Sequence, residues 1–118
     1  MKESILLDKS KSFALRIIRL YKHLVEQKHE YILSKQLLRS GTCIGANIKE
    51  GFFAQSRADF CAKLFIAQKE CAETEYWLEL LYESEYLNQC EFDSIYTDCQ
   101  ELMKLIVSLT KTLQGKSS

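Results

Sequence analysis

Apolar residues recur at helical spacing in four stretches of the chain, and short polar connections separate these stretches. In residues 4–27, steps of four and three residues place two adjoining apolar rows on one face. These rows are Phe13, Ile17, Leu20 and Leu24, with Ala14, Ile18, Tyr21 and Val25 beside them. Residues 91–113 have the most regular seam: Ile95, Cys99, Leu102, Ile106, Leu109 and Leu113. Both stretches therefore predict amphipathic helices.

Residues 57–87 form the longest stretch and are apolar on more than one side. One stripe follows a heptad pattern: Phe60, Leu64, Ala67, Cys71, Thr74, Leu78 and Leu81. Further apolar side chains lie off this stripe: Phe65, Tyr76, Trp77, Leu80 and Tyr82. A helix with this pattern is buried by more than one neighbour.

The second stretch, residues 31–53, has two glycines within its helical pattern. Gly41 and Gly45 each cost roughly 1 kcal/mol relative to alanine in a helix. We expect the close approach of a neighbouring helix to offset this cost. Ser56 then provides a predicted N-cap for the third helix, with Asp59 as a weak capping-box partner.

Four helices with short connections predict an all-α fold, an antiparallel up-down-up-down four-helix bundle formed by residues 1–118 as one domain. The chain has no proline and only four glycines, which favours long uninterrupted helices. An array of helical hairpins is not supported, because the sequence has no internal repeat.

The charges change sign along the chain although the net charge is zero. Residues 1–50 carry ten Lys/Arg against five Asp/Glu, and residues 51–118 carry six against eleven. The predicted topology places one basic group at the end that holds the termini: Lys2, Lys9, Lys11, Lys49, Arg57, Lys63, Lys111 and Lys116. It places an acidic group at the other end: Glu79, Glu83, Glu85, Glu91 and Asp93. Two ordinary solvated surfaces are the alternative explanation.

The sequence predicts a cytoplasmic protein with no membrane segment. Five cysteines without a C-x-x-C pair, and no signal peptide before them, indicate free thiols in a reducing compartment. No apolar run approaches the ~18 residues of a membrane span.

No catalytic, metal or cofactor site is predicted. A di-iron bundle needs Glu-x-x-His on two helices, and Glu26 to His29 is the one such motif, at a helix end. The cysteines do not converge as zinc ligands, and nucleophilic catalysis lacks a neighbouring base. An enzyme is therefore the least favoured function.

The run from Arg39 to Gly51, RSGTCIGANIKEG, resembles the signature of the 23S ribosomal RNA intervening-sequence protein family, also called the four-helix-bundle protein family. The resemblance continues through Asp59-Phe60, Lys63-Leu64, Ile66-Ala67, Lys69-Glu70 and Glu73 to Leu78, and Cys43 stands where the family often has serine. It implies an antiparallel four-helix bundle that assembles into a ring, commonly a pentamer. It also implies kinship with the accessory variability determinant of diversity-generating retroelements, a basic pentamer that binds reverse transcriptase and RNA.

A structural polar cluster is predicted between the second and third helices, from Arg39, Asn47, Glu50, Glu70 and Glu73. Our hypothesis is that Arg39 or Asn47 pairs with a glutamate of the third helix and fixes the register of the two helices. A buried charge is costly unless it is paired. The alternative is that these groups are solvated at the edge of the bundle.

Two functions follow as expectations. The first is a homo-oligomeric scaffold or accessory protein whose interface is Tyr76, Trp77, Leu80 and Tyr82, because one subunit does not need all of this apolar surface internally. The second is RNA binding within a ribonucleoprotein, through the basic end of the ring. Its candidate residues are Lys9, Lys11, Arg16, Arg19, Lys49, Arg57 and Lys63.

Overall fold

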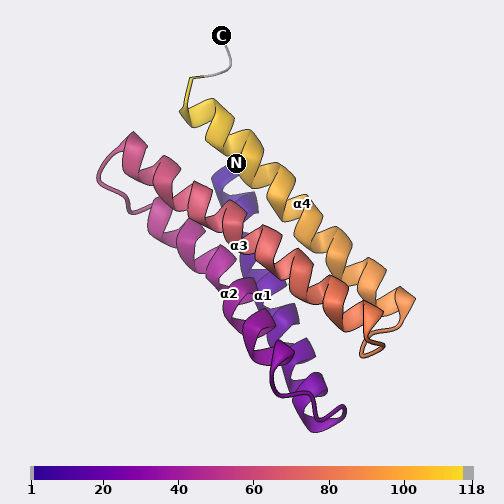
Figure 1. The fold of residues 1–118 in the computed structure, drawn as a ribbon. Helices are drawn as coiled ribbons and strands as arrows, with labels where there is room; N and C mark the ends of the chain where they lie inside the picture. The colour runs from indigo at the N-terminus through magenta and orange to yellow at the C-terminus, as the bar shows by residue number, and fades with distance from the viewer. Residues whose placement is uncertain (1, 116–118) are drawn as a thin grey trace.

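A computed structural model describes residues 2–115, with side chains from Ile5 onward. It contains four helices: α1 (Lys2–Glu26), α2 (Leu33–Gly51), α3 (Arg57–Glu83) and α4 (Gln89–Leu113). Each helix runs antiparallel to the one before it (Figure 1). Contacts join α1 to α2, α2 to α3, α3 to α4 and, most sparsely, α4 back to α1. The predicted all-α four-helix bundle is confirmed.

The connection between α3 and α4 differs from the prediction. We expected the third helix to reach residue 87, but α3 ends at Glu83, and Glu85 has a left-handed φ of 72°. The chain then turns back, and the backbone N–H of Tyr86 donates to the Leu81 carbonyl at 2.8 Å. A capping box starts α4 two residues earlier than predicted, because the side chains of Asn88 and Glu91 each accept the other's backbone N–H.

The start of α2 is capped by Glu30, which lies in the short polar connection before the helix. Glu30 is only 8% exposed, and its carboxylate accepts the backbone N–H groups of Ile32, Leu33 and Ser34 at 3.3, 3.0 and 2.7 Å. These are the donors that a helix start leaves without intrahelical partners. A carboxylate here also faces the positive end of the helix dipole. The predicted cap of α3 is confirmed, since the Asp59 N–H donates to Ser56 Oγ at 3.1 Å.

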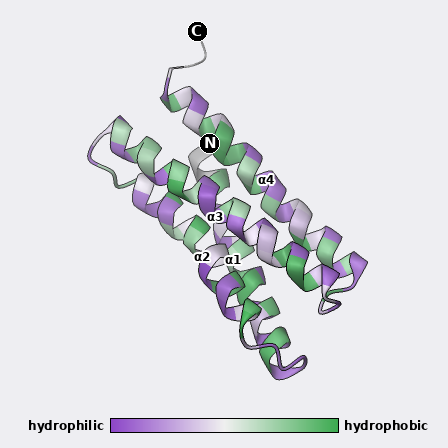
Figure 2. Cartoon of the chain, viewed as in Figure 1, coloured by the Kyte–Doolittle hydropathy of each residue, from purple (hydrophilic) through white to green (hydrophobic). Residues whose placement is uncertain are grey.

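The core is formed mainly by the predicted apolar stripes of all four helices. Hydrophobic residues, in green, occur along every helix in Figure 2. Two hydroxyls lie within the core between α2 and α3. Thr74 Oγ1 is 2.9 Å from Ser40 Oγ and 2.7 Å from the Glu70 carbonyl oxygen, and both hydroxyl-bearing side chains are fully buried. Among the described residues, every fully buried side-chain polar atom has a hydrogen-bond partner. The polar side chains buried in the described core are therefore satisfied by other protein groups.

Gly41 lies in close contact with Ile17 of α1. A Cβ placed on Gly41 would lie 2.8 Å from Ile17 Cγ1 and 2.9 Å from Ile17 Cγ2. At Gly45 the same atom would lie 3.4 Å from Ser10 Oγ, which is ordinary contact. The predicted close approach is confirmed, and it is tighter at Gly41 than at Gly45.

We expect Gly41→Ala to lower the free energy of unfolding by about 1–3 kcal/mol, because the added methyl forces Ile17 out of a packed position. Gly45→Ala is the matched control. It should be neutral, or stabilising by up to about 1 kcal/mol through helix propensity. Urea unfolding followed by circular dichroism measures both. Equal destabilisation by the two substitutions would contradict the difference in helix spacing.

Candidate interaction surfaces

Arg39 of α2 joins two glutamates and a tryptophan of α3. Its Nη1 is 3.3 Å from Glu70 Oε1, and its Nη2 pairs with the Glu73 carboxylate. Glu73 Oε1 in turn accepts the indole N–H of Trp77 at 3.4 Å. The Arg39 side chain is 47% exposed, so each ion pair is worth at most about 1 kcal/mol. The network therefore fixes orientation across α2 and α3 more than it adds stability.

The other two members of the predicted polar cluster lie elsewhere. The amide of Asn47 donates to the Cys43 carbonyl of its own helix at 2.9 Å. Glu50 pairs with Lys63 Nζ at 3.0 Å, which raises the pKa of the Lys63 ammonium. The single five-residue cluster is wrong because Arg39 and Glu50 are eleven residues apart, about 16 Å along α2. They therefore face different turns of the antiparallel α3.

The four residues of the predicted oligomer interface also differ in their surroundings. Tyr76 is 53% exposed, and its ring centroid is 5.2 Å from that of the half-buried Trp77. Leu80 is likewise half-buried. Tyr82 instead stacks on Phe92 of α4, with ring centroids 4.5 Å apart and planes at 17°. Tyr82 is half-buried, and the stacking leaves it in contact with α4 and apart from the Tyr76–Trp77 pair.

Phe65 is an exposed aromatic residue of α3 that does not belong to the predicted oligomer interface. It is 44% exposed and lies eleven residues before Tyr76, or about three helical turns, so the two share a face. The eleven-residue spacing between Phe65 and Tyr76 is the sequence signal that predicts a shared helix face. We call this outer face the α3 ridge; it comprises Ala62, Phe65, Ala72, Tyr76 and Leu80, and Lys69 interrupts it.

Three of the seven basic residues proposed for RNA are held in ion pairs. Lys9 pairs with Glu101 at 3.3 Å and Arg16 with Asp98 at 2.7 Å, both across α1 and α4. Lys63 pairs with Glu50. The remaining four are exposed, and no ion pair to another described residue is found for them: Lys11, Arg19, Lys49 and Arg57.

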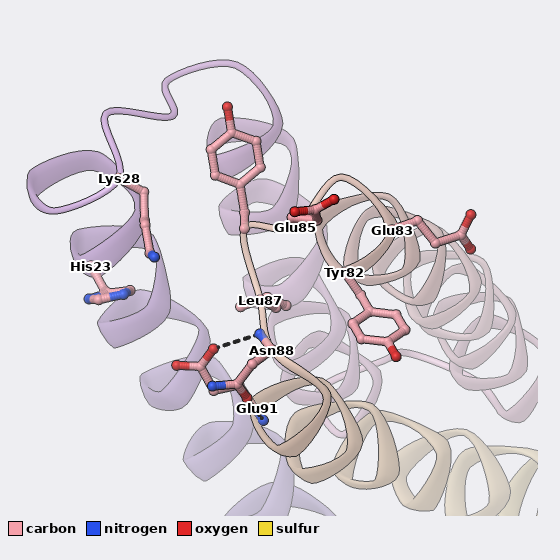
Figure 3. Close-up of a pocket in the computed structure, with 9 residues that line it drawn as sticks. His23, Lys28, Tyr82, Glu83, Glu85, Leu87, Asn88 and Glu91 are labelled. Atoms are coloured by element: carbon pink, nitrogen blue, oxygen red, sulfur yellow. Dashed lines mark hydrogen bonds between the residues drawn. The ribbon is translucent and has the colours of Figure 1, made fainter.

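The simple division into a basic and an acidic end is wrong. Carboxylates neutralise part of the basic end, while Lys116 and the side chain of Lys2 lie outside the described residues. At the other end, His23 and Lys28 line the same hollow of about 750 Å³ as Glu83, Glu85 and Glu91 (Figure 3). The α1–α2 and α3–α4 connections meet there, which mixes the two signs. The opposite net charges of the first and second halves of the chain are unaffected.

A second hollow, of about 690 Å³, lies on the outer side of α1 and α2. We call it the α1–α2 hollow; its lining is Leu7, Asp8, Ser10, Lys11, Ala14, Thr42, Gly45, Ala46, Lys49 and Glu50. Half of the lining residues are small: Ser10, Ala14, Thr42, Gly45 and Ala46. Each helix brings one base and one acid to it: Asp8 and Lys11 from α1, and Lys49 and Glu50 from α2.

The seam between α3 and α4 contains ionisable groups held close together. The hydroxyl of Tyr96 donates to Glu79 Oε2 at 2.7 Å, which raises the pKa of Tyr96. Burial, with a smaller effect from the Glu79 charge, raises the pKa of Glu75. Cys71 and Cys99 are buried in the same seam, and all five cysteines are free. Within residues 2–115, no three His, Cys, Asp or Glu side chains are grouped to hold a metal ion.

Two comparisons place the chain among known proteins. The family model described as "23S rRNA-intervening sequence protein" matches residues 2–108. The chain belongs to this family. A solved protein with unknown function, from the S23 ribosomal protein family of Bacteroides thetaiotaomicron VPI-5482, is 55% identical with a TM-score of 0.93. The match covers 94% of this chain and 99% of that one.

No curated protein matches the chain. The 23S rRNA-intervening sequence family match spans α1, α2, α3 and most of α4, so it includes the α3 ridge and the α1–α2 hollow. The resemblance seen in residues 39–51 is thereby confirmed. In the described part of this family member, no helix combines the length and apolarity needed to cross a membrane.

We expect Glu75→Gln to stabilise the protein at neutral pH. Because the folded-state pKa of Glu75 is raised, ionisation costs stability as the pH rises through that pKa. The amide removes this cost, so the midpoint of thermal unfolding should be higher than that of the wild type at pH 7. Below about pH 4 the carboxyl is protonated in both states, and the difference should vanish. A Glu75→Gln midpoint below that of the wild type at pH 7 would contradict a pKa of Glu75 raised by burial.

Proposed function

We propose that this chain is a non-enzymatic scaffold or accessory protein that assembles with copies of itself through the α3 ridge. The observation that carries the proposal is the exposure of Phe65 and Tyr76 on a helix whose opposite face is buried core. Aromatic residues clustered on an exposed face are typical of protein interfaces. A ring of five copies is the assembly that the family resemblance implies.

The Arg39 network supports an interface at this position. Through Glu73 it holds the indole of Trp77, which lies against the Tyr76 ring. An aromatic pair whose orientation is already fixed loses less conformational entropy when a partner covers it. Tyrosine, tryptophan and arginine are also the residue types that dominate the binding energy of interfaces.

We expect Tyr76→Lys to dissociate the wild-type assembly, because the ammonium must lose water when a second subunit covers it. Tyr31→Lys is the matched control, since Tyr31 is 51% exposed but lies in the connection before α2. Light scattering at micromolar concentration, after chromatography, gives the masses. A monomeric wild type, or a Tyr76→Lys variant with the wild-type mass, would remove this function.

RNA binding through the basic half of the chain is the second candidate. Lys11 and Lys49 favour it, because both line the α1–α2 hollow and no carboxylate pairs with either among the described side chains. Binding of this kind would rest on phosphate contacts and weaken as salt rises.

Fluorescence anisotropy with a labelled, structured RNA tests this candidate. The double substitution Lys11→Gln and Lys49→Gln should weaken binding at low salt and make the slope of log Kd against log[NaCl] shallower by about 2. Lys22→Gln and Lys35→Gln, at exposed positions outside the hollow, should change the slope only if contacts are non-specific. No binding by the wild type at low salt would exclude the candidate.

A further inference from the structure

The α2–α3 loop, residues 52–56, presents one aromatic ring to solvent and packs another against α3. Phe53 is 79% exposed, the highest fraction among the large hydrophobic residues that the structure describes. Phe52 is half-buried, and its ring meets that of Phe60 in α3 edge-on, with centroids 4.9 Å apart. Single exposed apolar residues are common on proteins, so the surroundings of Phe53 decide what its exposure means.

The backbone that carries Phe53 is held in place on both sides. The Phe53 N–H donates to the Glu50 carbonyl at 3.1 Å, and the Ala54 N–H donates to the Gly51 carbonyl at 3.1 Å. Gly51 lies directly against the Phe60 ring, because a Cβ on it would be 2.8 Å from Cδ1 of that ring. A ring on a backbone that is already ordered loses less conformational entropy when a ligand covers it.

Two basic residues flank the exposed ring in sequence, one on each helix that the loop joins. Lys49 lies in the last turn of α2, four residues before the ring, and Arg57 begins α3, four residues after it. Both are exposed, and neither forms an ion pair with a side chain that the structure describes. The nearby carboxylates are Glu50, which pairs with Lys63, and Asp59 in the first turn of α3. The loop therefore offers two free cations beside one free carboxylate.

We propose that the α2–α3 loop binds an unpaired base of single-stranded RNA, with the base stacked on Phe53 and the phosphates on either side of it contacting Lys49 and Arg57. An aromatic ring with basic residues beside it is the arrangement by which proteins bind single strands. RNA bases become accessible to such a ring where they are unpaired, in loops, bulges and ends. This inference rests on the second candidate function, RNA binding, and names the part of the RNA that is recognised.

The position of the loop also favours RNA over an anionic membrane. Lys49 lines the α1–α2 hollow as well, so the loop continues the surface on which the RNA candidate already rests. Insertion into a membrane interface relies on a broad apolar face. The loop has one exposed aromatic residue, and the polar residues Gln55 and Ser56 follow shortly after it.

Fluorescence anisotropy with a labelled single-stranded RNA of about 12 nucleotides tests the stacking. Phe53→Leu keeps an apolar side chain without a ring, and it should weaken binding by about 5–150-fold, the contribution of one stacked base. Phe53→Tyr keeps the ring and should bind like the wild type. Stacking displaces no counterions, so Phe53→Leu should leave the slope of log Kd against log[NaCl] unchanged. Lys49→Gln and Arg57→Gln should each make that slope shallower by about 0.7.

Tyr31→Leu is the matched control and should keep the wild-type affinity, since Tyr31 is 51% exposed but lies in the connection before α2. Circular dichroism checks that each variant folds. Phe53→Leu with the wild-type affinity, or Phe53→Tyr as weak as Phe53→Leu, overturns the stacking while leaving the phosphate contacts of Lys11 and Lys49 standing.

Two further results would also overturn the inference. One is tighter binding of the wild type to a fully paired RNA duplex than to the single strand. The other is cosedimentation with vesicles of anionic phospholipid that Phe53→Leu abolishes while RNA binding stays unchanged, which would make a membrane the partner. Absence of binding to any RNA at low salt overturns the inference together with the RNA candidate.

Discussion

The close contact between the backbone of α2 at Gly41 and the side chain of Ile17 sets the spacing of the first two helices, and other features depend on it. On the outer side of the same two helices lies the α1–α2 hollow, whose lining includes the small residues Ala14, Gly45 and Ala46. On its other side α2 meets α3, where Ser40 and Thr74 place their hydroxyls 2.9 Å apart inside the core. A larger residue at position 41 would move α2 relative to both neighbours, because packed interiors transmit small displacements.

The contact between α2 and α3 also affects the exposed aromatic residues of α3, through the Arg39 network. Arg39 lies half in solvent, so its two ion pairs contribute little to folding. Their geometric effect is larger, since Glu73 is shared between the guanidinium and the indole N–H of Trp77. The arrangement of two helices inside one subunit thus reaches the face that we propose for contact between subunits.

The two halves of the chain carry opposite charge, and inside a subunit they meet at two very different seams. Between α2 and α3 the contact is mainly apolar, with the Arg39 network and the Glu50–Lys63 pair at its edges. Between α1 and α4 the contact is sparse, and the pairs Lys9–Glu101 and Arg16–Asp98 cross it. Lys9 and Arg16 are paired here, and Lys63 is paired with Glu50 between α2 and α3. The proposal of RNA binding therefore rests on Lys11 and Lys49, for which no ion pair to a described residue is found.

The sequence by itself determined the four helices, the buried stripes, the Ser56 cap and the need for close packing at Gly41, because these depend on periodicity and on local backbone preference. Only the tertiary structure decided that Glu30 caps α2, that Glu50 pairs with Lys63 and not within the Arg39 network, and that Tyr82 stacks on Phe92. The physical reason is that a helical period is a local property of the sequence, whereas contacts between helices are not. A helical period specifies which side of a helix is apolar, but the partner of a polar or aromatic side chain depends on which turn of a neighbouring helix lies opposite, and that register emerges only when all four helices pack.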